Sequence, residues 1–356
     1  MDLAASLLRA AEAIGIDALG FCTAEPFLEA REAIEVNKAA GRHGGMQFTY
    51  RNPARSTTPT DALPGARSII VAALSFHAER TDASVQPAAR IAKYVWTDRY
   101  AELRSRLEAL TDVLGAAGHA SRIVCDDNAL VDRAAARRAG IGWQGKNTNI
   151  LVPGLGSNVV LGSILTDADL PQGEPMLDGC GTCTRCVPAC PTGALDEPGV
   201  LDASRCLAWL VQASGVFPRE FRAALGDRIY GCDDCQEVCP PNRRAARVHL
   251  GDPGRQWAPL LDLLAMDDDT LIERYGAWYI PQRDPRYLRR NALVALGNTG
   301  NAADPDLRPL LEVYLDPADD LLCAHAIWAA DALGIDHGLV EADLGPLSAA
   351  EVRAQR

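Results

Sequence analysis

The chain has 356 residues, of which 48% are hydrophobic and 23% are charged, and its formal net charge is −12 at pH 7. This composition is typical of a soluble protein with a substantial core and two or three domains. The acidic balance argues against broad nucleic-acid binding, because phosphate contacts need a concentration of Lys and Arg.

The first predicted element is an N-terminal amphipathic helix. Its apolar face combines Leu3, Leu7, Leu8, Ala11 and Ile14 at helical spacing. No basic region leads into an apolar run here, so we expect no signal peptide and a cytoplasmic location. No stretch of about 18 apolar residues occurs in the chain, so we expect no membrane span.

Helices and strands then alternate up to residue 167. The apolar patterns predict strands over 66–74, 121–126 and 158–167, and helices over 100–118 and 128–140. This alternation indicates an α/β or α+β sheet domain over residues 1–167.

Cysteine usage defines the next domain, which we place at residues 168–245. Eight of the eleven cysteines lie between residues 180 and 239. The total is odd and no secretory signal is present, so a disulfide framework is not expected. Metal ligation in a reducing cytosol is the better interpretation.

Two cysteine runs have the spacing of iron–sulfur ligands. The first is Cys180-x2-Cys183-x2-Cys186-x3-Cys190-Pro191. In two-cluster ferredoxins the fourth cysteine of such a run ligates the other cluster. The second run, Cys232-x2-Cys235-x3-Cys239-Pro240, is one cysteine short, and Cys206 can supply the missing ligand.

We therefore predict two 4Fe–4S clusters with exchanged ligands. The first is held by Cys180, Cys183, Cys186 and Cys239, and the second by Cys190, Cys206, Cys232 and Cys235. Zinc is the alternative, but it favours pairs of CxxC motifs separated by a longer loop. The remaining Cys22, Cys125 and Cys323 are interpreted as small buried residues.

The sequence of residues 246–356 predicts a third domain, which is helical. The stretches "RRNALVALGNTG" (289–300) and "AIWAADALG" (326–334) share an Ala-x-x-Ala-Leu-Gly ending, 37 residues apart. That period is close to the period of HEAT-like helix pairs. Two unrelated Ala-rich helices are the alternative.

Clusters deliver electrons, and composition alone does not name what receives them. No G-x-G-x-x-G follows a strand at a helix start, so a dinucleotide-binding fold is not predicted. The D-x-H-x-x-G pattern, which supplies a histidine to cobalt in many cobalamin proteins, is also missing.

Five stretches together resemble the epoxyqueuosine reductase family. They are "HGGM" (43–46), "DALPGARSIIVAAL" (61–74), "DRAAARRAGIGWQGKNTNIL" (132–151), "LGDRIYGCDDCQEVCPPNR" (225–243) and "LRRNALVALGN" (288–298). The similarity spans roughly residues 1–300. The run "GDRIYGCDDCQ" is long and unusual, which makes the resemblance specific.

The resemblance implies a cobalamin-dependent iron–sulfur enzyme that reduces epoxyqueuosine in tRNA to queuosine. The implied fold class is α+β, with a reductive-dehalogenase-like cobalamin-binding α/β domain, a ferredoxin-like double-cluster insert and HEAT-like helices. This family holds cobalamin base-off without a protein histidine, in keeping with the missing D-x-H-x-x-G. We expect a monomer that takes electrons from a donor such as ferredoxin or flavodoxin.

An acid is implied near the epoxide, because the oxygen must leave as hydroxide or water. The family's proton donor precedes the helix that leads into Gly140-Ile141-Gly142-Trp143, and this register matches Asp126. Asp127 is adjacent, and two neighbouring carboxylates can raise one pKa. A solvated turn with Asp127 or Asn128 as helix cap is the alternative.

The resemblance also implies cofactor contacts. They are Arg55, Asp126, Gly145, Lys146, Asn147, Ile150, Leu161, Gly162, Asp233 and Asp234. A glycine-rich turn, a surface arginine and hydrogen-bonded loop caps are the corresponding structural alternatives.

For tRNA, the candidate patch is "RDPRYLRR" (283–290) with Arg286, Arg289 and Arg290, which Arg243 and Arg244 can extend. The alternative is a solvated helix face. The family usually has G-x-D-Y-H where this chain has Thr97, Arg99 and Ala101, and Ser where it has Ala208. A small-molecule reductase of the same architecture, a ferredoxin-like carrier and an RNA-binding cluster protein remain as alternatives.

Overall fold

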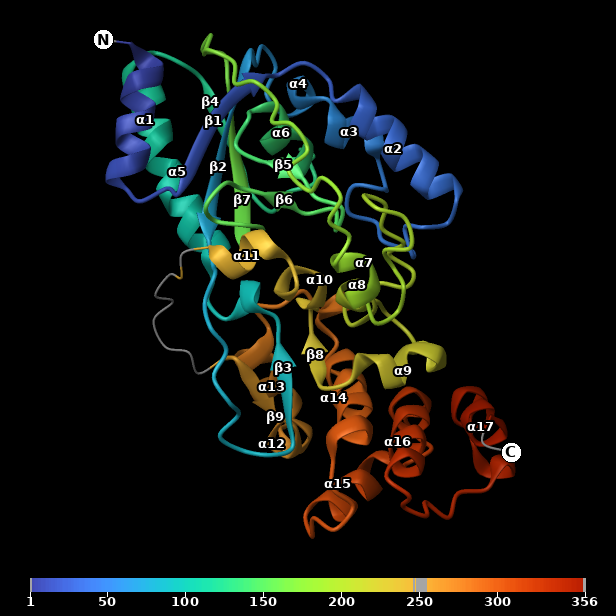
Figure 1. Cartoon of the computed structure of the whole chain (residues 1–356). Coiled ribbons are helices and arrows are strands. Elements are labelled where there is room, and N and C mark those ends of the chain that lie inside the picture. Colours follow the sequence, from blue (N-terminus) through green and yellow to red (C-terminus); the bar gives the residue numbers. More distant parts are fainter. Residues whose placement is uncertain (1, 246, 248–254, 355–356) are drawn as a thin grey trace. The chain divides into compact units, whose positions relative to one another are not determined.

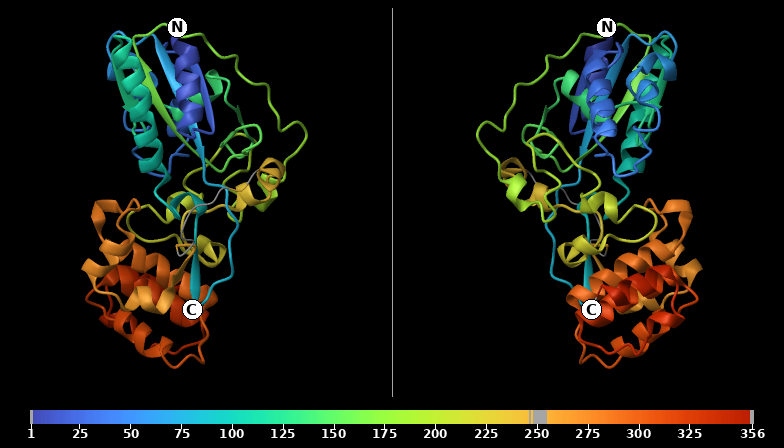
Figure 2. Two further views of the ribbon diagram at one scale, coloured as in Figure 1. Left: turned by 90° about the vertical axis from the view of Figure 1, so that its left-hand side faces the viewer. Right: turned by 90° about the vertical axis from the view of Figure 1, so that its right-hand side faces the viewer.

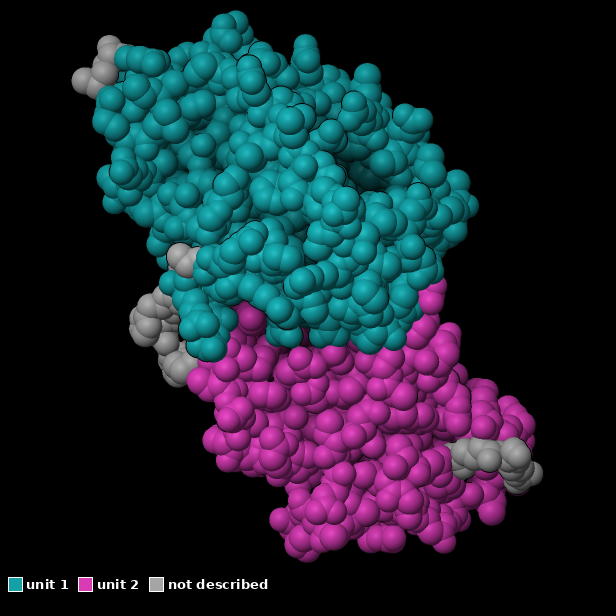
Figure 3. All heavy atoms as spheres, viewed as in Figure 1, with its two compact units in different colours: residues 1–79, 97–204, 233–251 teal, residues 80–96, 205–232, 252–356 magenta. Residues whose placement is uncertain are grey.

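The computed structural model describes residues 2–245, 247 and 255–354. The chain forms two compact units that interleave along the sequence (Figure 3). The first unit comprises Met1–Glu79, Thr97–Ser204 and Asp233–Gly251, and the second comprises Arg80–Trp96, Arg205–Cys232 and Asp252–Arg356. The predicted division into 1–167, 168–245 and 246–356 stays a prediction, and residue 246 lies outside the described residues.

An antiparallel four-stranded sheet forms the core of the first unit. Its order is β1-β2-β7-β4, with β1 at Ala18–Thr23, β2 at Ser68–Ser75, β7 at Val159–Thr166 and β4 at Ser121–Val124. All eight residues of β2 are buried, because helices cover both faces of the sheet. The three strands predicted from apolar patterns are confirmed, and the antiparallel sheet with flanking helices is of the predicted α+β class.

Helices cover the two faces of this sheet (Figures 1 and 2). On one face, α1 (Leu3–Ala13) packs beside α5 (Arg99–Ala116), which buries Leu103, Leu107, Leu110 and Leu114 at helical spacing. On the other face, α6 (Asp132–Arg138) buries Ala135 and Ala136 against the odd-numbered residues of β2. Apolar burial on both faces therefore fixes the strand ends around β4 and β7.

The helix predicted over 128–140 begins later, at Asp132. Asp126 has a φ of 51°, in the left-handed region that non-glycine residues seldom adopt, so no helix can pass through it. The Asp127 carboxylate then accepts a hydrogen bond from the Ala129 N–H at 2.9 Å. This local bond replaces a helical turn, so residues 125–131 form a loop.

The remaining elements of the first unit are one helix of 12 residues, α2, and several short helices and strands. They are α2 (Leu28–Ala39), α3 (Pro53–Thr57), α4 (Pro59–Ala62), β5 (Trp143–Gln144), β6 (Ile150–Leu151), α7 (Cys186–Ala189), α10 (Asp234–Glu237) and α11 (Pro240–Arg244). Strands β5 and β6 form a hairpin, in which Gln144 pairs with Ile150.

The second unit combines a small sheet with helices. Strand β3 (Ala88–Ile91) pairs in parallel with β8 (Arg228–Tyr230) and antiparallel with β9 (Trp257–Pro259). The helices are α8 (Leu207–Leu210), α9 (Arg219–Leu225), α12 (Leu260–Ala265), α13 (Asp268–Tyr275), α14 (Arg286–Thr299), α15 (Leu307–Tyr314), α16 (Asp320–Ala332) and α17 (Pro346–Arg353). Single 3-10 turns lie at Lys93–Val95, Pro281–Arg283 and Glu341–Asp343.

The two stretches of the predicted internal repeat lie on α14 and α16, which pack against each other. Their shared glycines differ in role. Gly297 lies inside α14, where an added Cβ would come within 2.6 Å of the Trp328 ring, whereas Gly334 follows α16 with a φ of 69°. The HEAT-like repeat therefore stays a prediction.

No helix among the described residues is long and apolar enough to cross a bilayer.

Candidate functional site

The first cysteine run folds as a chain of tight turns. The Cys183 N–H donates to the Cys180 carbonyl at 3.0 Å, Cys186 begins α7, and Cys190 ends it. The Cys190 sulfur accepts a hydrogen bond from the Ala194 N–H at 3.2 Å. Backbone donors of this kind stabilise a thiolate, which is the form that ligates iron.

The second cysteine run folds against the first. Helix α10, which contains Cys235, packs on α7, and Cys239 stands at the start of α11 (Figure 1). Burial, together with the negative charges of Cys180, Cys186 and Cys183, raises the pKa of Cys239 to about 11. The four thiols of the first predicted ligand set are thus neighbours within the first unit.

The other predicted ligand set divides between the units: Cys190 and Cys235 belong to the first, and Cys206 and Cys232 to the second. All eleven cysteines are free thiols. Within the described part of the chain, no three His, Cys, Asp or Glu side chains stand close enough to share one metal ion.

A buried amide anchors the second run to the sheet. The Asn242 Oδ1 accepts from the Ser157 N–H at 2.6 Å, and its Nδ2 donates to the Gln236 carbonyl at 2.8 Å. Gln236 in turn donates to the Ser157 carbonyl at 2.9 Å. An added Cβ at Gly156 would come within 2.0 Å of the Asn242 Oδ1, so this loop must carry glycine there. Sequence reasoning missed this anchor.

The predicted cofactor loop, residues 142–150, is hydrogen-bonded to both cysteine runs. The Lys146 ammonium donates to the Gly181 carbonyl at 2.6 Å, between Cys180 and Cys183. The Asn147 amide, almost fully buried, donates to the Cys235 carbonyl at 3.4 Å. Two side chains of one loop thereby fix it to the segments that carry the predicted cluster ligands.

Close packing explains the glycine in this loop. A Cβ at Gly145 would come within 2.3 Å of Leu151 and 2.8 Å of the Asn147 Oδ1. The Gly145 N–H closes the turn by donating to the Asn149 carbonyl at 2.8 Å. Any larger residue would displace Asn147 from its contact with the cysteine run.

A pocket of about 340 Å³ opens beside this loop. Its walls combine two cations, one carboxylate, an indole and a primary amide: they come from Arg137, Trp143, Gln144, Gly145, Lys146, Met176, Asp178, Pro198 and Gly199. The indole Nε1 of Trp143 is buried without a hydrogen-bond partner. Such a lining suits a ligand that carries amides or anionic groups.

Three other predicted cofactor contacts lie in different surroundings. Ile150 is buried in the core between the sheet and α6. Gly162 lies on β7, where an added Cβ would meet Leu103, Leu107 and the Cys125 sulfur at 3.0–3.1 Å. Its glycine therefore lets α5 approach the sheet. Leu161 is half-buried, with its side chain packed on the α6 side.

Two further groups complete the predicted contacts. Arg55 is exposed on α3, whose first turn is capped by the Asn52 side chain. Asp233 is buried at the start of α10, where its carbonyl accepts from the Gln236 and Glu237 N–H groups at 2.8 Å. Asp234 is half-buried in the first turn of α10. Helix initiation thus accounts for part of the role of these two aspartates.

Asp126 follows β4 and belongs to a cluster of acidic groups. Partial burial raises the pKa of its carboxyl, the Arg104 guanidinium opposes this rise, and the carboxylates of Asp127 and Asp98 add to it. Arg104 also donates to the Cys125 carbonyl, which holds the strand end in place. The carboxyl is therefore more easily protonated near neutral pH than an ordinary aspartate.

Asp132, at the start of α6, is a neighbour that sequence reasoning missed. Its Oδ1 is sealed from solvent and has no hydrogen-bond partner. Burial, and to a smaller extent the carboxylates of Asp126 and Asp127, raise its pKa to about 7, against the opposing charge of Arg133. The signal in the sequence was the third aspartate of "DDNALVD" (126–132), six positions after Asp126.

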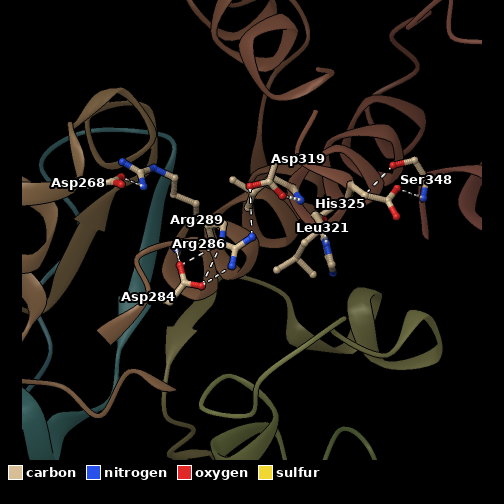
Figure 4. A network of polar contacts seen from close by, with 10 residues as sticks. Asp268, Asp284, Arg286, Arg289, Asp319, Leu321, His325 and Ser348 are labelled. Carbon is tan, nitrogen blue, oxygen red and sulfur yellow. Dashed lines mark hydrogen bonds and ion pairs between the residues drawn. The ribbon is translucent and has the colours of Figure 1, made fainter. Parts of the chain in front are cut away.

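The predicted tRNA patch needs a correction. Arg290 is fully buried, and its guanidinium donates to the carbonyls of Leu210, Val211, Ala213 and Gly215 at 2.6–3.4 Å. Arg289 is also buried and pairs with Asp268 (Figure 4). Its guanidinium also donates to the Met266 carbonyl. Both guanidinium groups are engaged in contacts within the second unit, so they are unavailable for phosphate contacts.

The other predicted arginines are exposed. Arg286 forms hydrogen bonds at 2.7–3.1 Å to both oxygens of Asp284, as Figure 4 shows. Arg243 donates to the Glu237 carbonyl at 3.2 Å, and Arg244 lies beside it on α11. Arg286 is thus partly neutralised, whereas Arg243 and Arg244 follow the second cysteine run directly.

At the positions where the chain departs from the family pattern, Arg99 takes a structural role. It pairs with Glu102 and donates to the Ser75 carbonyl at the end of β2. Ala101 lies in the first turn of α5, which the Asp98 side chain caps. The Thr97 hydroxyl is buried without a hydrogen-bond partner.

Comparison with known proteins defines the class of this one. Residues 179–242 match the family model described as a 4Fe-4S double cluster binding domain, so the chain is an iron–sulfur protein with a double-cluster domain. Residues 57–127 match the model described as epoxyqueuosine reductase QueG, DUF1730. The epoxyqueuosine reductase of Bacillus subtilis is 36% identical over 346 residues, which cover 94% of this chain and 88% of the relative. The chain belongs to the epoxyqueuosine reductase family.

Solved structures of this family share the fold of the whole chain. An epoxyqueuosine reductase with an epoxyqueuosine-modified tRNA-Tyr stem loop matches with a TM-score of 0.88 and 31% identity, covering 98% of this chain and 96% of that chain. The Bacillus subtilis enzyme, solved with its catalytic aspartate loop swung out of the active site, matches with a TM-score of 0.88 and 32% identity over the same shares. The predicted family and its α+β fold are confirmed.

Proposed function

We propose that this protein reduces epoxyqueuosine to queuosine in tRNA, with two 4Fe–4S clusters and base-off cobalamin as its cofactors. The observation that carries the proposal is the loop 142–150, which joins both cysteine runs through Lys146 and Asn147. A cofactor held by this loop would lie next to the segments that carry the proposed cluster ligands. The family membership and the relative solved with a modified stem loop support tRNA as the substrate.

The proposed cluster ligands are those of the sequence analysis. Cys180, Cys183, Cys186 and Cys239 would hold the first cluster, and Cys190, Cys206, Cys232 and Cys235 the second. The proximity of Cys239 to the first run supports the exchanged arrangement. A donor such as ferredoxin or flavodoxin would reload the clusters, and we propose that the enzyme works as a cytoplasmic monomer.

The pocket beside the loop, at about 340 Å³, is smaller than a whole corrinoid, but its side chains are of the kind that would contact the edge of one. The pocket offers an ammonium, a guanidinium and an amide to the amide and phosphate groups that such a cofactor carries. Lys146 and Asn147 would position it, and Gly145 would keep the loop close to it. Arg55, Ile150, Leu161, Gly162, Asp233 and Asp234 are proposed as further contacts on the family resemblance, although none of them lines this pocket. When bound, cobalamin supplies a reduced cobalt centre that is strongly nucleophilic and reducing.

Asp126 is the proposed acid. Removal of the epoxide oxygen as water consumes protons, and burial raises the pKa of the Asp126 carboxyl above its ordinary value, which favours the protonated form of this acid. Its left-handed backbone holds it on a loop, as in the relative whose catalytic aspartate loop moves out of the active site. Arg104 holds the preceding residue through the Cys125 carbonyl, at the start of this loop.

The test is single-turnover reduction of a stem-loop RNA that carries epoxyqueuosine, by anaerobically reconstituted protein, with the nucleosides analysed by mass spectrometry. Wild type should form queuosine, and Asp126→Asn should bind RNA and retain iron and cobalt yet lose turnover. Asp202→Asn is a matched control, because Asp202 makes an ordinary surface turn with Ser204. Wild-type rates in Asp126→Asn would remove the acid assignment, and absence of queuosine with wild type would remove the proposed function.

A further inference from the structure

Two side chains of opposite charge are hydrogen-bonded to the start of the first cysteine run. The Lys146 ammonium donates to the Gly181 carbonyl at 2.6 Å, and the Asp178 Oδ1 accepts from the Cys180 N–H at 2.8 Å. Both side chains also line the pocket beside the loop 142–150. A cation and an anion are therefore bonded to two consecutive residues of this run.

The backbone that carries these two charges is held in place. The Lys146 carbonyl accepts a hydrogen bond from the Gly199 N–H at 2.8 Å. Next to Asp178, an added Cβ at Gly179 would come within 2.6 Å of the Trp143 ring, so the run passes close to strand β5. Close packing on one side and a backbone hydrogen bond on the other keep both side chains beside the run.

The run fits a four-thiolate cluster. Helix α7 begins at Cys186 and packs against α10, and Cys239 follows two residues after α10 ends. All four proposed ligands belong to the first unit. Two neighbouring segments can therefore supply the four cysteines that a 4Fe–4S cluster requires.

We propose that Lys146 raises, and Asp178 lowers, the reduction potential of the first proposed 4Fe–4S cluster. This inference rests on the proposed function for the ligand set of that cluster. One-electron reduction adds a negative charge to a cluster, and its potential depends on nearby charge, hydrogen bonds and exposure to solvent. An ammonium bonded to the run stabilises the reduced form, and a carboxylate stabilises the oxidised form. Both side chains are positioning residues that act through the run, not ligands.

Solvent exposure ranks the two effects. Lys146 is half-buried, whereas Asp178 is exposed, so water and salt screen the aspartate more strongly. Arg137, the third charged residue that lines the pocket, is exposed and lies 3.8 Å from a Glu29 carboxylate oxygen, which offsets part of its charge. Lys146 should therefore have the larger effect on the potential, and its charge should ease reduction of the cluster by an external donor.

The experiment is a redox titration of the anaerobically reconstituted protein, without RNA or corrinoid, at low ionic strength. Paramagnetic resonance of the reduced clusters reports the midpoint potentials. Lys146→Gln should move one midpoint to a lower value, and Asp178→Asn should move the same midpoint to a higher value by a smaller shift. Lys146→Arg, which keeps the charge, should stay close to wild type. Lys38→Gln is the matched control, because Lys38 donates to the Tyr50 carbonyl at 2.8 Å, outside both cysteine runs.

Iron analysis shows whether each variant carries both clusters, and Asp178→Asn provides the test if Lys146→Gln loads poorly. The proposal is overturned if Lys146→Gln leaves both midpoints at their wild-type values. It is also overturned if Asp178→Asn shifts the midpoint in the same direction as Lys146→Gln, as a damaged loop would, or if Lys146→Arg shifts it as far. If wild type carries both clusters yet forms no queuosine, the proposed function fails, and the midpoint shifts still decide this inference.

Discussion

Arg290 in the second unit is fully buried, and Asp132 in the first is a half-buried residue with one carboxyl oxygen sealed from solvent. The guanidinium of Arg290 donates to four backbone carbonyls, whereas the Asp132 Oδ1 has no partner. A buried charge with all its partners stabilises a fold, because each hydrogen bond replaces one lost to water. A carboxyl oxygen that is sealed from water without a partner costs stability when the group is ionised, so it favours the protonated form.

The largest effect should come from removing the satisfied charge. Arg290→Ala would remove the guanidinium donor from the carbonyls of Leu210, Ala213 and Gly215, whereas the Val211 carbonyl would keep the Asn291 amide as a donor. We expect a loss of about 3–5 kcal/mol of unfolding free energy. Anaerobic thermal melts should show a fall in the unfolding temperature of the second unit by roughly 6–12 °C.

Arg286→Ala is the control for this experiment, because Arg286 is exposed and pairs with Asp284 at the surface. Exposed pairs are worth about 0–1 kcal/mol, so its melting temperature should stay within roughly 2 °C of wild type. Equal effects of the two variants would break the contrast between buried and exposed arginines.

The buried Asn242 amide in the first unit, whose hydrogen bonds are formed, allows the same comparison to be made there. Asn242→Ala removes an acceptor of the Ser157 N–H and the donor to the Gln236 carbonyl, and we expect a loss of about 2–3 kcal/mol. Because Asn242 anchors the run that carries Cys235 and Cys239, iron bound per chain should also fall. Iron analysis checks this, with exposed Asn301→Ala, which should retain full iron, as the control. Full iron content in Asn242→Ala would contradict the anchoring role.

Unlike the two preceding substitutions, Asp132→Asn should stabilise the protein relative to wild type as the pH rises. The folded pKa of about 7 lies above the ordinary value of 3.8, so wild type loses stability as pH rises from about 4 to 7. The amide cannot ionise, so the stability of the variant relative to wild type should increase by about 1–2 kcal/mol between pH 5 and pH 8. Melting temperatures at the two pH values test this. A constant difference would mean that Asp132 titrates normally.

The smallest effect that we expect is on RNA binding, from the exposed arginines of α11. Replacing Arg243 and Arg244 by Ala should weaken binding of the stem-loop RNA about fivefold and reduce its logarithmic salt dependence by about one to two. Fluorescence anisotropy at several salt concentrations measures both quantities. Arg308→Ala, an exposed arginine paired with Glu312 in the second unit, should leave binding unchanged. An unchanged slope in the double variant would remove these arginines from the interface.

The sequence predicted what depends on local spacing. The strands around Ile70 and Ile164 follow from continuous apolar runs, and the cluster ligands follow from cysteine spacing, which the double-cluster family match supports. The burial of Arg290 could not be predicted, because a helix with two consecutive arginines looks solvated until the carbonyls of a distant segment are known. Asp132 was missed for the same reason, since its missing partner is a property of packing.

The interleaved order of the two units bears on how the chain folds during synthesis. Strand β3 leaves the ribosome roughly 140 residues before its parallel partner β8, and at about 5–20 residues per second it waits on the order of ten seconds for it. The first cysteine run likewise emerges before Cys239, which lies close to it in the finished fold. Iron delivery to the proposed first cluster is therefore completed only after more than half of the chain has been translated, and a nascent chain arrested earlier would expose unligated thiols.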